Sequence, residues 1–157
     1  MSRATVGRPM EILLVEDDLV QARLVMEAVR RGDFGHRISL IRDGQEALDF
    51  IFKRGVYRSA PRPDLMLLDL RLPSIDGLDV LSQIKGDHEM ASIPIVIMTS
   101  SQDEEDRLSC EKHAVEGYLT KPVNLEKFLS LLKQLRQFWR ADMLLPRALQ
   151  DSASRIA

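Results

Sequence analysis

Asp69 stands where a carboxylate could act as a nucleophile. It directly follows the apolar run Leu65 to Leu68, and a stretch rich in Pro and Gly comes after it. A second apolar run, Ile12 to Val15, is followed by Glu16 and Asp17. If both runs are parallel strands of one sheet, the three carboxylates meet in one crevice, where mutual repulsion raises their pKa values unless a cation lies among them. The spacing therefore predicts a divalent-metal site beside a nucleophilic aspartate.

Two later runs of strand length end on Thr99 and close to Lys121. Mg²⁺ takes oxygen ligands and often uses one or two carboxylates, so Asp17 and Asp69 would bind it directly and Glu16 through water. If an oxygen of Asp69 attacks a phosphodonor, negative charge spreads over three equatorial oxygens. Mg²⁺, the Lys121 ammonium and the Thr99 hydroxyl could each stabilise one of them. The product would be an aspartyl phosphate.

The elements that must position these residues alternate along the chain between apolar runs of strand length and segments of helical period. This alternation is typical of successive βα units that form a parallel sheet covered on both faces. Strands are expected at Glu11 to Val15, Ile38 to Ile41, Leu65 to Leu70, Ile95 to Met98 and Gly117 to Leu119. Helices are expected at about Leu19 to Arg31, from Asp43-Gly44 to Phe52, at Gly77 to Lys85, from the acidic residues 103–106 to His113, and from Asn124 to about Trp139.

The first helix and the loop before the third strand carry more specific expectations. Either Asp17 or Asp18 would cap the helix. Residues 53–63 are expected to lack regular structure, because a glycine and two prolines fall within them. The apolar residues spaced to cover one face of the helix are Val20, Leu24, Val25, Ala28 and Val29.

The composition limits the protein class. With 157 residues the chain is expected to form one domain, over 10–140, between a flexible N-terminus (1–9) and a partly ordered C-terminal extension (141–157). A net charge of −2 disfavours nucleic-acid binding, and the single cysteine, Cys110, excludes an internal disulfide. No apolar stretch reaches the roughly 18 residues that cross a bilayer, so a cytoplasmic protein without membrane insertion is expected.

Four motifs, in order and each at the end of a strand, resemble those of the receiver domains of two-component response regulators. They are Val15-Glu16-Asp17-Asp18, the stretch from Leu67 to Pro73, Met98-Thr99-Ser100 and Thr120-Lys121-Pro122. The resemblance spans Glu11 to about Trp139. It implies a flavodoxin-like fold, a (βα)5 doubly wound sheet with strand order 2-1-3-4-5.

The resemblance also implies a role for each residue of the site. Asp69 would be the phosphoacceptor, and Lys121 and Thr99 would bind the phosphoryl group. Tyr118 would be the aromatic residue that responds to it. The residues implied as Mg²⁺ ligands are Glu16, Asp17, Asp69 and, through its backbone carbonyl, Arg71.

Within that family, the loop from Pro73 to Gly77 and the pair Phe138-Trp139 look most like the single-domain regulators that partner bacterial phytochromes. A histidine kinase of the phytochrome type is therefore the expected phosphodonor, and the downstream protein partner is open. A homodimer through the fourth helix, fifth strand and fifth helix is also expected. The side chains suggested for a self-association face are Phe128, Leu132, Phe138 and Trp139.

Other functions use a similar set of residues. A phosphorelay intermediate or a phosphate sink would carry the same motifs as a switch. A phosphatase of the haloacid dehalogenase type, with an Asp nucleophile, places a second Asp two residues after the first, where this chain has Arg71. No turnover of an external substrate is expected. The sequence leaves both isomers of the Lys121-Pro122 bond open.

Overall fold

The structure, a computed structural model, describes residues 7–100, 104–147 and 149. Five parallel strands form one sheet in the order β2-β1-β3-β4-β5, which confirms the predicted flavodoxin-like topology. The strands are β1 (Met10–Val15), β2 (His36–Ile41), β3 (Leu65–Asp69), β4 (Ile95–Thr99) and β5 (Gly117–Thr120). The α-helices are α1 (Leu19–Arg31), α2 (Gly44–Ile51), α3 (Gly77–Lys85), α4 (Glu104–Glu111) and α5 (Leu125–Gln134).

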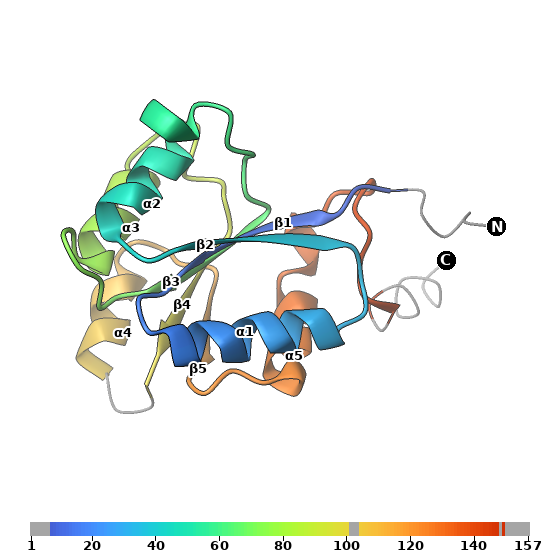
Figure 1. Ribbon diagram of the computed structural model, residues 1–157. Coiled ribbons are helices and arrows are strands. Elements are labelled where there is room, and N and C mark those ends of the chain that lie inside the picture. Colours follow the sequence, from blue (N-terminus) through green and yellow to red (C-terminus); the bar gives the residue numbers. More distant parts are fainter. Residues whose placement is uncertain (1–6, 101–103, 148, 150–157) are drawn as a thin grey trace.

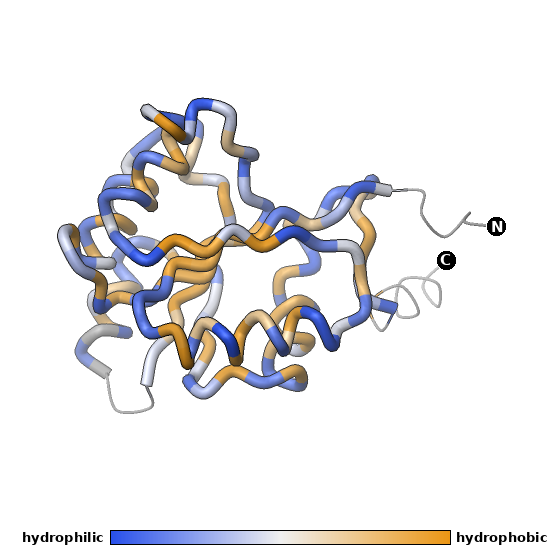
Figure 2. The backbone as a smooth tube through the Cα atoms, viewed as in Figure 1, coloured by the Kyte–Doolittle hydropathy of each residue, from blue (hydrophilic) through white to orange (hydrophobic). Residues whose placement is uncertain are grey.

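Helices cover both faces of the sheet, as Figure 1 shows: α1 and α5 lie on one face, and α2, α3 and α4 lie on the other. The central strands are apolar on both sides, because each face is covered, and Figure 2 shows them as the most hydrophobic segments of the chain. Every residue of β3 and β4 is buried. Two hydrophobic clusters result, one under each helical layer.

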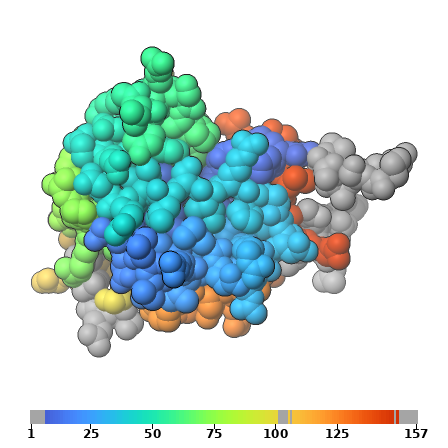
Figure 3. All heavy atoms as spheres, viewed as in Figure 1, coloured from blue at the N-terminus to red at the C-terminus, as the bar shows by residue number. Residues whose placement is uncertain are grey.

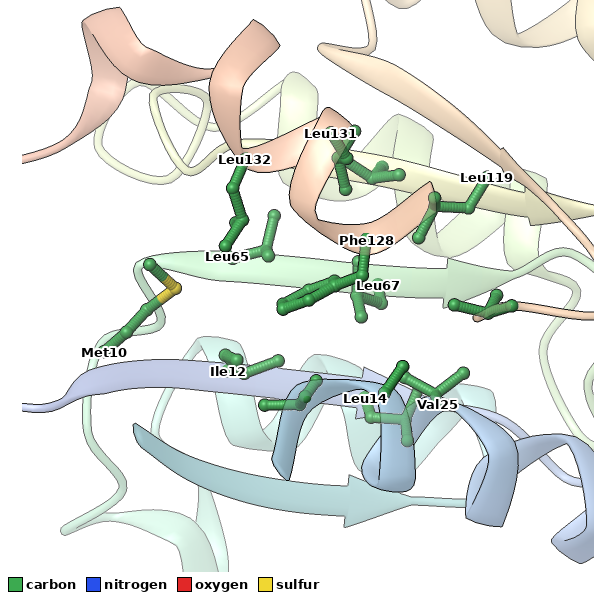
Figure 4. Close-up of a cluster of buried hydrophobic side chains, with 14 of the residues drawn as sticks. Met10, Ile12, Leu14, Val25, Leu65, Leu67, Leu119, Phe128, Leu131 and Leu132 are labelled. Carbon is green, nitrogen blue, oxygen red and sulfur yellow. The ribbon is translucent and has the colours of Figure 1, made fainter. Parts of the chain in front are cut away.

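Phe128 is the largest fully buried side chain and lies in the cluster under α1 and α5. Figure 4 shows it reaching from α5 towards β3, where Leu67 lies, with Leu14 and Val25 on the side of β1 and α1. Leu132, one turn later in α5, is also 0% exposed. Both residues are part of the monomer's core.

The buried face of α1 differs from the predicted one. Val25, Ala28 and Val29 are buried as expected, but Val20 is 67% exposed and Leu24 is 38% exposed. Ala22 is fully buried in their place, so α1 rests on the sheet through a narrower stripe of mostly small side chains. Its outer side forms part of the molecular surface in Figure 3.

Other boundaries shift by one or two residues, except that α5 ends at Gln134, about five residues earlier than predicted. β1 begins at Met10 and β2 at His36, so both strands start earlier than predicted, and α4 ends at Glu111. The segment 53–63 was wrongly expected to lack regular structure, because Gly55–Tyr57 forms a short 3-10 helix. Gly55 has φ +55°, and a glycine adopts this left-handed conformation without steric cost.

The segment after α5 packs against the domain, and its first part lies within the helix that was expected to reach about Trp139. A 3-10 helix, Arg136–Phe138, follows α5, and Met143 and Leu149 are buried in the core. Arg8 pairs with Met143 in an isolated parallel bridge. The two ends of the described chain are thus joined beside the start of the sheet. The division at residues 9 and 141 into a flexible N-terminus, a domain and a partly ordered extension stays a prediction.

Arg8 carries most of this junction. Its guanidinium donates two hydrogen bonds to Asp64, at 2.7 and 2.9 Å, and a third to Asp142 at 3.0 Å. The two carboxylates raise the pKa of Arg8 above its already high usual value. None of the helices in the described ranges combines the length and apolar character needed to span a membrane.

Candidate functional site

The predicted site residues lie at the carboxyl edge of the sheet, where the C-terminal ends of the strands meet. Asp69 is the last residue of β3 and pairs in register with Met98 of β4. Thr99 ends β4 opposite Thr120, and the backbone N–H of Lys121 donates to the Thr99 carbonyl at 2.8 Å. Strand register alone therefore brings these residues to one edge.

Lys121 connects the carboxylates of two strands. Its ammonium nitrogen lies 2.6 Å from Oε1 of Glu16 and 3.3 Å from Oδ2 of Asp69. The peptide bond from Lys121 to Pro122 is cis. The contact with Asp69 agrees with the expectation that Lys121 lies beside the attacking carboxylate. The shorter contact, with Glu16, was not predicted, because Glu16 was expected to face a metal-bound water.

Glu16 is the most deeply buried ionisable group of the site, with 0% of its surface exposed. Burial raises its pKa to about 7, because a carboxylate loses its hydration there; Lys121 opposes this shift and Asp69 adds to it. Among the described residues, none donates a well-aligned hydrogen bond to its Oε1. The Lys121 charge is therefore the main compensation for this oxygen.

Asp69 faces a small cavity. Its side chain is 12% exposed, and the backbone N–H of Arg71 donates to its Oδ1 at 3.3 Å. The cavity has a volume of about 240 Å³, which leaves room in front of the carboxylate for a group of phosphoryl size. It is lined by Asp69, Leu70, Arg71, Met98, Thr99, Ser100 and Lys121.

Thr99 borders this cavity, but its hydroxyl donates to the carbonyl of the next residue, Ser100. Tyr118 lies one strand position before Leu119 and points its hydroxyl at the carbonyl of Arg107, 3.2 Å away. The Arg107 guanidinium lies over the Tyr118 ring, 4.7 Å from its centroid. Burial raises the pKa of Tyr118. Both side chains thus have local partners away from Asp69.

Asp17 lies at the same edge but is more exposed than its neighbours, at 51% for the side chain. Arg42 approaches it, with a guanidinium nitrogen 3.8 Å from Oδ1 and a hydrogen bond of 3.1 Å to the Asp17 carbonyl. Asp17 borders a second cavity, of about 390 Å³, which Leu70 and Arg71 line from the loop after β3. The cap of α1 is Asp18, which accepts from the N–H groups of Val20 and Gln21.

The oxygen donors at this edge fit a magnesium ion. Within the ranges described, no three histidine, cysteine or acidic side chains gather closely enough to hold a metal by themselves. Mg²⁺ does not need such a cluster, because it keeps several of its waters and takes only one or two carboxylates. The open cavity beside Asp17 has room for that hydration. Oε1 of Glu16 accepts no well-aligned hydrogen bond from the described residues, and a bound water could donate one.

The suggested self-association face is wrong for two of its four members. Phe128 and Leu132 are fully buried inside the monomer and present no surface to a partner. Phe138 and Trp139 are partly buried and pack against the same core cluster. The Trp139 indole N–H donates to the Leu132 carbonyl at 2.9 Å, which fixes the aromatic pair to the end of α5.

The comparisons with known proteins agree with this arrangement. Residues 12–133 match the response regulator receiver domain family. The chain is 39% identical over 140 residues to response regulator Rcp1 of Synechocystis sp., an alignment that covers 89% of this chain and 95% of Rcp1.

Solved structures give the same relationship. The bacteriophytochrome response regulator RtBRR superposes with a TM-score of 0.76 at 36% identity, over 85% of this chain and 81% of its own. The Mn²⁺-bound form of Rcp1 has a TM-score of 0.71, and the phosphorylated cyanobacterial phytochrome response regulator RcpA has one of 0.72. Each of the latter two is 38% identical and covers 88% of this chain and 99% of the other. The chain therefore belongs to the family of response regulator receiver domains, and its relatives include phytochrome response regulators.

Proposed function

We propose that this protein is a phosphorylation-dependent signalling switch that takes a phosphoryl group onto Asp69 with the help of Mg²⁺. The observation that carries this proposal is the position of Lys121, whose ammonium lies 3.3 Å from Asp69 beside an open cavity. A buried carboxylate that only stabilised the fold would need no accessible space in front of it. Here the carboxylate, the cation and the space occur together.

The chain's own residues account for the transfer. One oxygen of Asp69 forms the new O–P bond as the bond from phosphorus to the donor breaks. The Lys121 ammonium, already held at the site, pairs with the charge on the transferring group. Mg²⁺ would be held by Asp17, Asp69 and the Arg71 carbonyl, with Glu16 acting through water, and when bound it supplies positive charge to the phosphoryl oxygens.

The switch follows from Thr99. Its hydroxyl now donates to Ser100, and rotation towards the phosphoryl group would give it a stronger, charged acceptor. That movement frees space beside Tyr118 and biases the surface formed by α4, β5 and α5. A downstream partner, or a second copy of the chain, would respond to this surface.

The proposed donor is a histidine kinase of the phytochrome type, because relatives that align with 85% and 88% of this chain are phytochrome response regulators. The proposal places the protein in the cytoplasm, without turnover of an external substrate. A phosphorelay intermediate or phosphate sink would use the same site.

The test is phosphorylation by a small acyl phosphate in the presence of Mg²⁺, followed by intact-protein mass spectrometry. Wild type should gain one phosphoryl group, and Asp69→Asn should gain none. Asp79→Asn, which changes an exposed aspartate of α3, should behave as wild type. Labelling of Asp69→Asn, or failure of wild type to be labelled, would refute the assignment. Transfer from candidate phytochrome kinases then tests the donor.

A further inference from the structure

The loop between β3 and α3 is joined to the start of α2 by a set of hydrogen bonds, here called the Asp43–Ser74 clasp. The Ser74 hydroxyl donates to Oδ1 of Asp43 at 2.9 Å, and the same oxygen accepts the N–H of Glu46 at 3.0 Å. In return, the N–H of Gln45 donates to the Ser74 hydroxyl at 3.3 Å, and that of Gly44 donates to the Pro73 carbonyl at 3.2 Å. Asp43 therefore both caps α2 and holds the loop.

Two glycines let the backbones approach closely at the ends of this loop. A Cβ atom on Gly44 would lie 2.0 Å from the carbonyl oxygen of Ile75, and one on Gly77 would lie 2.4 Å from the Cα of Leu70. The N–H of Gly77 also donates to the Leu70 carbonyl at 2.9 Å. The loop is thus fixed to the end of β3 on one side and to α2 on the other. Figure 1 shows α2 and α3 next to each other on that face of the sheet.

Ser74 adopts a conformation that a side chain normally avoids. Its φ is +63°, and the N–H of Ile75 donates across it to the Pro73 carbonyl at 2.9 Å, which makes Ser74 the centre of a γ-turn. Such a conformation costs free energy and persists only where surrounding contacts impose it. The clasp supplies those contacts, because both hydrogen-bonding functions of the Ser74 hydroxyl are used.

The clasped loop forms a wall of the phosphorylation site. It begins directly after Asp69, and its Arg71 N–H donates to Oδ1 of that residue. Leu70, Arg71 and the following residues line the cavity of about 390 Å³ that Asp17 borders from the other side. The position of the loop therefore sets the distance between the backbone of Arg71 and the carboxylates of the site.

We propose that Asp43 and Ser74 are positioning residues for the divalent cation, because the clasp holds the loop after Asp69 in its metal-binding position before the cation arrives. This inference rests on the proposed function and goes beyond it, since neither residue touches the carboxylates. A preordered loop lets the cation bind without paying for ordering the backbone. Without the clasp, that cost is transferred to the binding step.

The experiment measures Mg²⁺ affinity by isothermal titration calorimetry and, separately, thermal stability in EDTA. Asp43→Ala and Ser74→Ala should each raise the Mg²⁺ dissociation constant by about threefold or more, because an ordering cost comparable to one hydrogen bond of ordinary strength then falls on the binding step. The double variant should bind Mg²⁺ no more weakly than the single variant with the lower affinity, because both changes break the same contact. Asp43→Asn keeps an oxygen acceptor and should restore the wild-type affinity.

The matched control is Asn124→Ala. Asn124 caps α5 through the N–H of Lys127, so this variant loses a helix cap of the same kind without touching the loop. It should lower the melting temperature about as much as Asp43→Ala and leave the Mg²⁺ dissociation constant unchanged. A clasp with only a structural role would make the two variants alike in both measurements.

The outcomes separate the two proposals. If wild type binds Mg²⁺ and the folded clasp variants bind it equally well, the positioning role is wrong and the proposed function stands. If wild type binds no Mg²⁺ at millimolar concentration, the proposed function and the positioning role both fail. If a clasp variant does not fold in EDTA, Asp43→Asn and Ser74→Ala still decide the question, since each retains the α2 cap.

Discussion

Lys121 lies closer to Glu16 than to Asp69, with its ammonium nitrogen 2.6 Å from the glutamate oxygen and 3.3 Å from the aspartate oxygen. The glutamate is also the more buried of the two. In the absence of a bound cation, the lysine therefore compensates the charge that is most costly to bury. When Asp69 is phosphorylated, the Lys121 ammonium must also pair with the phosphoryl group. Glu16 and the phosphoryl group therefore compete for one ammonium.

Lys121→Met should destabilise the metal-free protein at pH 8. The substitution keeps the length of the side chain but leaves the buried Glu16 carboxylate without its cation, a change that costs about 3 kcal/mol for a buried pair. Urea unfolding in EDTA measures the loss. Lys133→Met, on the exposed side of α5, is the control and should change the free energy of unfolding little. Equal effects of the two substitutions would show that the Lys121 charge is not needed by the fold.

Glu16→Gln should change how stability depends on pH. Burial raises the pKa of Glu16 in the folded protein to about 7 from its ordinary value of 4.5. Between these values the folded protein binds a proton that the unfolded chain has released, so wild-type stability falls as the pH rises through this window. The loss is complete only about one pH unit above the folded pKa and is on the order of 3 kcal/mol. The amide variant has no such proton.

The measurement is the difference in the free energy of unfolding between wild type and Glu16→Gln, in EDTA, from pH 4.5 to 8.5. The free energy of unfolding of the variant should rise relative to that of wild type as the pH rises. In a second series with Mg²⁺ in place of EDTA this difference should be smaller, because Mg²⁺ stabilises the ionised carboxylate of wild type. Parallel pH profiles would mean that the Glu16 pKa is not raised.

The sequence was sufficient to predict the fold and the location of the site. Strands buried on both faces are short, nearly continuous apolar runs, so they are easily recognised, and Asp69, Thr99 and Lys121 each follow one of them. Parallel strands then place these residues at one edge regardless of side-chain detail. The strand order was implied by the resemblance to receiver domains, whereas the residue pattern alone predicted only the alternation of strands and helices.

The pairing within the site could not be predicted in the same way. Glu16, Asp17 and Asp69 are all carboxylates at one edge, and only their burial, 0% for Glu16 against 51% for the Asp17 side chain, decides which one holds Lys121. The prediction that Val20 and Leu24 of α1 are buried was wrong for a related reason. Helical period gives the direction of a buried face but not its width, so Val20 and Leu24 were wrongly included.

Phe128→Ala should lower stability without changing association. Its side chain is fully buried between α5, β3 and α1, and removing a buried phenylalanine ring costs about 3–5 kcal/mol. Urea unfolding gives the stability, and size-exclusion chromatography with light scattering gives the mass of the folded fraction. Val56→Ala, at a position 91% exposed, is the control for stability. A folded Phe128→Ala protein whose dimerisation alone was weakened would restore this residue to an association surface.

Arg8→Ala should show that the junction between the two ends of the described chain stabilises the domain. Arg8 forms a two-pronged contact with Asp64, which is only 13% exposed and also accepts the N–H of Glu11 at 2.8 Å. Its removal leaves a largely buried carboxylate without its cation, which should cost about 2 kcal/mol. Arg37→Ala breaks a single contact of 3.3 Å to Glu11 from a side chain that is 71% exposed, and should cost no more than about 0.5 kcal/mol.

Chemical denaturation compares the stability of the two variants. Hydrogen exchange of the Leu144 amide reports the junction directly, because this amide donates to the Arg8 carbonyl at 2.8 Å. Exchange should accelerate in Arg8→Ala alone, and equal protection in both variants would show that the Arg8 guanidinium does not hold the segment in place.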